Sequence, residues 1–103
     1  MITLIENHLK ELQDLCRTFR VRRLEIFGSS VDKNKFDPNT SDLDLLVEFQ
    51  PLKEGQYADT YFGLLEALET LFQRHVDLVM PSAIKNPFFL ESINQCREII
   101  YAA

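Results

Sequence analysis

The sequence predicts an α/β (α+β) domain in which a mixed sheet of about four strands carries helices packed on it. Two stretches hold apolar residues at helical spacing, and several short stretches rich in Val, Ile, Leu and Phe have the length of strands. The predicted order is helix, strand, strand, helix, strand, helix, strand. With 103 residues and 46% hydrophobic content, the chain has the size of one domain with one core, which we assign to residues 1–103.

The first element is predicted to be a helix over residues 3–19. Thr3 and Glu6 have the spacing of a capping box, in which the hydroxyl accepts an unpaired amide hydrogen and the acid reaches back. Apolar residues then recur at alternating steps of three and four, which places them on one helical face. These residues are Ile2, Ile5, Leu9, Leu12, Cys16 and Phe19.

Two strands and a polar loop are predicted to follow the first helix. Residues 21–28 (VRRLEIFG) form the first strand, and Gly28 ends it. Residues 30–41 are rich in Asp, Asn, Pro, Lys and Thr, which is typical of a loop. Residues 43–49 (LDLLVEF) are apolar on both faces beyond Asp44, so we expect this strand to lie in the middle of the sheet.

The rest of the chain is predicted to complete the sheet. A second long helix should cover residues 61–75 after a cap at Asp59 or Thr60, and residues 76–80 (VDLVM) should form the third strand. Its inward residues should be Phe62, Leu65, Leu68 and Phe72. Asn86 and Pro87 have the order of a helix cap and first helical residue, and residues 97–102 (REIIYA) are the candidate fourth strand.

Two acids stand at the entry of the second predicted strand. Because strand side chains alternate, Asp42 and Asp44 project from the same face, with Cα atoms about 6.5 Å apart. Two carboxylates this close resist ionising together because their charges repel. A bound divalent cation, which accepts oxygen ligands, favours the ionised form of both. Asp77 lies near the start of the third predicted strand and would join the pair if the two strands are neighbours. These three residues are the predicted Mg²⁺ ligands and catalytic residues.

The turn before the loop has the composition of a phosphate-binding turn. Gly28 follows a strand, and glycine allows a sharp turn with close approach to a ligand. Successive amides and hydroxyls from Ser29 onward could surround phosphate oxygens. Together with the three acids, this favours metal-dependent phosphoryl or nucleotidyl transfer. A metal-dependent nuclease built on the same acids is less favoured, because the turn and the acidic charge suit a triphosphate better than a polymer.

The segment LEIFGSSVDKNKFDPNTSDLDLLVEF resembles the minimal nucleotidyltransferases of the DNA polymerase beta-like superfamily, whose signature is Gly-Ser followed by Ser-Asp-x-Asp-Leu. HVDLVMPSAI and CREIIYA resemble later segments of that family. The resemblance implies the polymerase beta-like fold and nucleotide contacts from Gly28, Ser29 and Ser41. It also implies that Asp42, Asp44 and Asp77 hold Mg²⁺, with two ions allowed.

The same resemblance implies a partner and a reaction. Family members transfer a nucleoside monophosphate, typically AMP from ATP, to a hydroxyl group, and small members often serve as antitoxins of HEPN-class toxins. Members often carry a basic residue where this chain has Asp32. That acid favours the alternative of a binding module that neutralises its partner by masking it. The sequence leaves open the nucleotide, the acceptor and homo-oligomer formation.

Composition bounds the remaining possibilities. The net charge of −5 argues against bulk nucleic-acid binding, and no stretch has the features of a signal peptide or a membrane span, so we expect a cytoplasmic protein. Cys16 and Cys96 are expected to be reduced and largely buried. His8 and His75 are interpreted as surface or capping residues, because no partner residue stands at ligand spacing.

Overall fold

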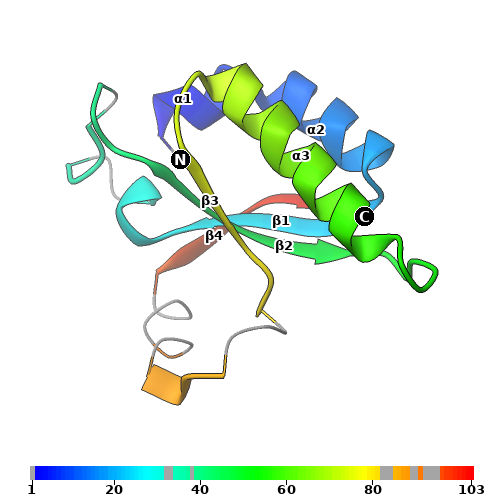
Figure 1. Ribbon diagram of the computed structural model, residues 1–103. Coiled ribbons are helices and arrows are strands. Elements are labelled where there is room, and N and C mark those ends of the chain that lie inside the picture. Colours follow the sequence, from blue (N-terminus) through cyan, green and yellow to red (C-terminus); the bar gives the residue numbers. More distant parts are fainter. Residues whose placement is uncertain (1, 32–33, 38, 82–84, 89–90, 92–95) are drawn as a thin grey trace.

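Four strands form one mixed sheet in the order β3-β2-β1-β4 (Figure 1). The computed structural model describes residues 2–31, 34–37, 39–81, 85–88, 91 and 96–103. The central strands β1 (Val21–Phe27) and β2 (Leu43–Phe49) are antiparallel, and β4 (Arg97–Ala102) pairs antiparallel with β1. The edge strand β3 (Val76–Val79) runs parallel to β2. The predicted mixed sheet of four strands is therefore confirmed.

The helices α1 (Thr3–Glu6), α2 (Leu9–Thr18) and α3 (Tyr57–Phe72) all lie on one face of this sheet (Figure 1). Their apolar residues pack against the strands and exclude water, which is the main stabilising term in a domain of this size. Among the described residues, no helix has the length and apolarity needed to cross a membrane. The fully buried side chains include Ile5, Leu12, Cys16, Leu24, Ile26, Leu43, Leu45, Val47, Leu64 and Leu68.

The single helix predicted over residues 3–19 is wrong, because the helix breaks at Asn7 and His8. The His8 amide donates to the Ile5 carbonyl three residues back, which interrupts the ladder of bonds four residues back. The predicted capping box is wrong too: Thr3 lies inside α1, and no side chain caps that helix. His8 is partly buried, with Nδ1 2.7 Å from the Leu4 carbonyl oxygen.

The long helix α3 begins at Tyr57, four residues before the predicted start, and neither Asp59 nor Thr60 caps it. The prediction that Phe62 points inward is wrong, since its side chain is 63% exposed. The buried residues follow one another at steps of four, and Phe62 stands two residues from the first of them, on the opposite side of the helix. They are Leu64, Leu68 and Phe72, with Leu65 partly buried against them.

The segment after β3 agrees with the sequence where it is described. Asn86 Oδ1 accepts the Phe88 amide at 2.9 Å, and Pro87 and Phe88 are helical, so the predicted cap is confirmed. Cys16 is buried as expected, and burial raises the pKa of its thiol to about 12. Cys96 is exposed, which contradicts the expectation that both thiols are buried. Residues 32 and 33, with the acid Asp32, lie outside the described residues.

Candidate functional site

The parallel pairing of β2 and β3 brings the predicted acids together. Asp44 and Asp77 are direct register partners, so both side chains leave the sheet on the same face. Asp42 stands one residue before β2 and adds a third carboxylate at the same end of the strands. The condition set by the sequence, that the two acid-bearing strands are neighbours, is met.

Donor atoms of Asp42, Asp77 and His75 all lie within 4.8 Å of one another, and all three side chains are exposed. Two ligands on opposite sides of a Mg²⁺ ion are about 4.2 Å apart, because each Mg–O bond is about 2.1 Å. Small side-chain adjustments therefore suffice to enclose a divalent ion. The two carboxylates of this group supply oxygen ligands of the kind that hard cations accept, and His75 adds a nitrogen.

Among these acids, Asp44 is the one whose ionisation the structure opposes. Partial burial, together with the neighbouring charges of Asp77 and Asp42, raises the pKa of its carboxyl to about 6. The nearby His75 opposes this shift without cancelling it. A carboxyl group that resists ionisation beside two other acids is the condition that a bound cation relieves.

Gly28 lies directly against Asp44. Its φ of +61° is in the left-handed region, and a Cβ atom there would stand 3.0 Å from Asp44 Oδ2. Gly28 opens a short 3₁₀ turn, Gly28–Ser30, at the end of β1. The fully buried Ser30 hydroxyl accepts the Asp44 amide at 3.0 Å, so the turn and the acid-bearing strand are joined. Sequence reasoning did not single out Ser30.

The loop that leads to the acids is held by Arg74, which the sequence interpretation also missed. Arg74 Nη1 donates to the Ser41 carbonyl at 3.0 Å, and its guanidinium carbon lies 5.6 Å from the centre of the buried Phe36 ring. The Ser41 hydroxyl accepts the Asp37 amide at 2.9 Å and closes the turn before Asp42. Ser41, a predicted nucleotide contact, thus shapes the loop in the structure.

His75 is exposed, as the sequence interpretation expected, and it also contacts the acidic group. Its Nε2 atom is 3.0 Å from Asp77 Oδ1, and its Nδ1 atom is 3.3 Å from Glu69 Oε2. The hydrogen bond to Asp77 raises the pKa of His75. The position of this histidine two residues before Asp77, at a strand start, was the signal for it in the sequence.

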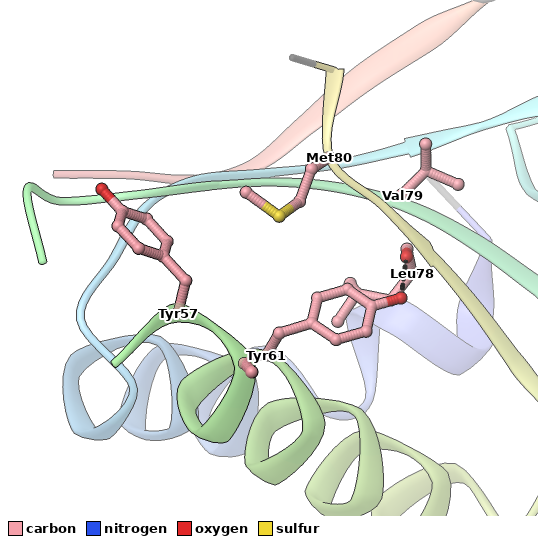
Figure 2. A pocket seen from close by; sticks show the side chains of 6 residues that line it. Tyr57, Tyr61, Leu78, Val79 and Met80 are labelled. Carbon is pink, nitrogen blue, oxygen red and sulfur yellow. Dashed lines mark hydrogen bonds between the residues drawn. The ribbon is translucent and has the colours of Figure 1, made fainter. Parts of the chain in front are cut away.

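A cleft of about 540 Å³ lies over the acids, with Asp44, His75 and Asp77 in its wall. An apolar pocket of about 410 Å³ adjoins it and shares Tyr61, Leu78 and Val79 with it (Figure 2). The Tyr61 hydroxyl donates to the Leu78 carbonyl at 2.5 Å and so closes part of the open edge of β3. The remaining lining residues of the pocket are Tyr57, Ala58 and Met80.

A family model described as a nucleotidyltransferase domain matches residues 5–100 of the chain. Two curated proteins of Methanocaldococcus jannaschii are similar over 95% of this chain and 90% of their own length. They are the "putative protein adenylyltransferase MJ1379", at 30% identity, and the "putative protein adenylyltransferase MJ0128", at 34% identity.

Solved structures agree with this match. The chain resembles a structure described as a "putative minimal nucleotidyltransferase", with 28% identity and a TM-score of 0.70 over 90% of this chain and 89% of that one. It also shares the fold of the MNT antitoxin in complex with a tri-AMPylated HEPN toxin from Shewanella oneidensis. That match has 14% identity and a TM-score of 0.64, and it covers 96% of this chain and 73% of the other.

Proposed function

Because the chain belongs to the nucleotidyltransferase domain family, we propose that it transfers a nucleoside monophosphate, AMP from ATP, to a hydroxyl group on a partner protein. The observation that carries this proposal is the meeting of Asp42, Asp44 and Asp77 beside a left-handed Gly28. Support for a protein acceptor comes from the two relatives named as protein adenylyltransferases.

We assign the divalent ions of the reaction to Asp42, Asp44 and Asp77, with Mg²⁺ as the expected ion and room for two. When bound, such ions neutralise triphosphate charge and stabilise the charge that develops during transfer. The pKa of Asp44, raised to about 6, supports this assignment, because ionised acids this close need a cation for compensation.

The triphosphate is assigned to the turn at the end of β1. Gly28 lets the backbone come close to phosphate oxygens, and the amides that follow it, beginning at Ser29, are the proposed donors. Ser41, which directly precedes Asp42 in the chain, is the third proposed nucleotide contact. The hydrogen bond between Ser30 and the Asp44 amide keeps the phosphate turn and the acids at a fixed separation.

In the proposed reaction, the acceptor hydroxyl oxygen attacks the α-phosphorus of ATP. The bond from that phosphorus to the oxygen bridging the β-phosphate breaks, and pyrophosphate leaves with the electron pair. A carboxylate of the acidic group takes the hydroxyl proton. The apolar pocket beside Asp77 gives a neighbouring side chain of the acceptor segment a place to bind, which suits a protein substrate (Figure 2).

The partner we propose is a HEPN-class toxin, with this chain as its antitoxin. The support is that the similar folds include antitoxins solved with HEPN toxins, one of them tri-AMPylated, and a toxin–antitoxin structure with AMP-PNP.

The test is transfer of label from α-³²P-ATP to a HEPN toxin encoded next to this chain, in the presence of Mg²⁺. Wild type should label the toxin, and Asp44→Asn should reduce the rate at least ~100-fold, because the variant loses a metal-binding carboxylate. Asp59→Asn is the matched control: Asp59 is an exposed acid in the first turn of α3 and should transfer label normally.

A second assay separates catalysis from masking. Cells carrying the toxin should lose protection when the antitoxin is folded Asp44→Asn. Full protection by Asp44→Asn, together with no label transfer by wild type, would establish a binding module that masks the toxin and would end the enzyme proposal.

A further inference from the structure

His75 presents a nitrogen donor to the acidic group. Its Nε2 atom lies 3.0 Å from Asp77 Oδ1, and the donor atoms of Asp42, His75 and Asp77 fall within one 4.8 Å cluster. Replacing the hydrogen bond to Asp77 by a bond to a shared cation needs only a small movement of an exposed ring. The ring is therefore placed as a ligand beside two carboxylates.

Glu69 supplies a second, independent feature of a metal-binding histidine. Glu69 Oε2 lies 3.3 Å from His75 Nδ1, on the side of the ring away from Asp77. The same oxygen accepts the Val76 amide at 3.2 Å, so the glutamate is held in place by the backbone of β3. Histidines that bind metals almost always donate their other ring N–H to a carboxylate or carbonyl, which fixes the tautomer and the ring orientation.

We propose that His75 is a ligand of the divalent ion together with Asp42 and Asp77, with Glu69 orienting its ring, and that this site prefers Mn²⁺ to Mg²⁺. The inference rests on the metal site of the proposed function; it adds a nitrogen ligand to that site and replaces Mg²⁺ by Mn²⁺ as the preferred ion. Mg²⁺ prefers an all-oxygen set, whereas a mixed set of imidazole and carboxylates suits first-row transition ions.

The first test measures ion affinity by Mn²⁺ electron paramagnetic resonance, with Mg²⁺ as competitor, at pH 8. Wild type should bind Mn²⁺ at least ~10-fold more tightly than Mg²⁺. His75→Asn should weaken Mn²⁺ binding at least ~10-fold and change Mg²⁺ binding less than about twofold, and Glu69→Gln should weaken Mn²⁺ binding by a similar factor.

The second test detects the bond itself. The chain has two histidines, so pulsed resonance spectra of protein labelled with ¹⁵N-histidine should show one nitrogen coupled to Mn²⁺. That coupling should vanish in His75→Asn and persist in His8→Gln, the matched control. His8 lies on the helical side, where its ring packs edge-on against Phe72 with centres 5.2 Å apart.

Two results would overturn the inference: Mn²⁺ bound without nitrogen coupling, or equal Mn²⁺ affinity in wild type and His75→Asn. Either could occur while Asp44→Asn still abolishes label transfer, in which case the proposed function stands and only the role of His75 is lost. Failure of wild type to bind any divalent ion would overturn both.

Discussion

Glu25 and the group of aspartates lie on the same face of the sheet, and they differ in how far neighbouring cations compensate their charge. Glu25 on β1 is the register partner of Leu46, which stands two residues beyond Asp44 on β2, so Glu25 and Asp44 share the face away from the helices. Glu25 is 3% exposed and forms ion pairs with Arg23 and with Arg97, the latter at 3.0 Å. Its charge is compensated within the chain.

At the other end of the face, Asp44 forms no ion pair with a described residue; His75 pairs with its neighbour Asp77 and offsets the charge near Asp44 only in part. Asp44 is surrounded by the carboxylates of Asp42 and Asp77, and the pKa of its carboxyl rises to about 6 as a result of burial and these charges. Burying a charge without a partner is costly, so chains keep such groups mainly where a ligand supplies the missing charge. The contrast indicates that Glu25 serves the fold, and it supports the proposal that the aspartates bind a cation.

The largest effect should come from placing a methyl group between the Gly28–Ser30 turn and Asp44. Gly28→Ala would strain a left-handed backbone and set Cβ about 3.0 Å from Asp44 Oδ2, displacing that carboxylate. We expect at least a ~100-fold loss of label transfer, since misplaced catalytic groups cost about this much. The measurement is the transfer rate beside a melting curve.

Gly55→Ala is the matched control for that variant. Gly55 also has a left-handed backbone, with φ +85°, but nothing lies within 4 Å of its added Cβ. The two variants should lose similar stability, about 1 kcal/mol, while only Gly28→Ala loses transfer. Equal transfer rates in both would mean that the separation between the turn and Asp44 is unimportant.

Substitution of Glu25, whose charge is paired with Arg23 and Arg97, should lower the stability of the protein rather than its activity. Glu25→Gln would leave the Arg23 and Arg97 guanidiniums without their shared carboxylate, and we expect unfolding free energy to fall by about 2 to 3 kcal/mol. Urea denaturation measures the change, and the exposed Glu66→Gln should shift it by less than about 0.5 kcal/mol. If Glu25→Gln were as stable as wild type but had lost label transfer, Glu25 would serve the reaction rather than the fold, and the contrast with the aspartates would be wrong.

Most of the fold could be predicted from the sequence because strands and long helices have local signals. Apolar runs predicted the four strands, whereas the pairing of β2 with β3, on which the meeting of the acids depends, is set by the structure. The helix break at His8 could not be predicted, since neither Pro nor Gly marks it; in the structure the His8 ring also packs against Phe72 from another helix. Phe62 was misassigned because apolar residues cover more than one side of α3.

The residues of the candidate site also fall into those that the sequence predicted and those that it did not. Asp42, Asp44, Asp77 and Gly28 stand in a recognisable spacing, so their meeting was predictable. Ser30, Glu69 and Arg74 act through partners distant in sequence or on another element: the Asp44 amide, the His75 ring and the Ser41 carbonyl. No local pattern marks such contacts, because they form only when the folded chain brings these residues together: Ser30 with β2, and the end of α3 with the starts of β2 and β3.

The smallest effect should be a gain in stability of the metal-free protein when Asp44 is replaced by Asn. The folded state raises the pKa of Asp44 from 3.8 to about 6, so it binds a proton more tightly than the unfolded state does. The cost of ionising Asp44 is therefore absent below pH 3.8, grows between pH 3.8 and 6, and is fully present above pH 6. Because the side chain is only half-buried, we expect Asp44→Asn to stabilise the metal-free protein by about 1 kcal/mol at pH 7.5.

Denaturation of wild type and Asp44→Asn at several pH values in chelator measures this gain. The two stabilities should converge near pH 3.8, where wild-type Asp44 is neutral in the folded protein. Saturating divalent ion should reverse the order at pH 7.5, because binding stabilises the folded wild type and the variant lacks one carboxylate. Glu25→Gln should lose stability with or without the ion. An Asp44→Asn protein less stable than wild type in chelator at pH 7.5 would mean that the chain itself already compensates Asp44, and the contrast with Glu25 would disappear.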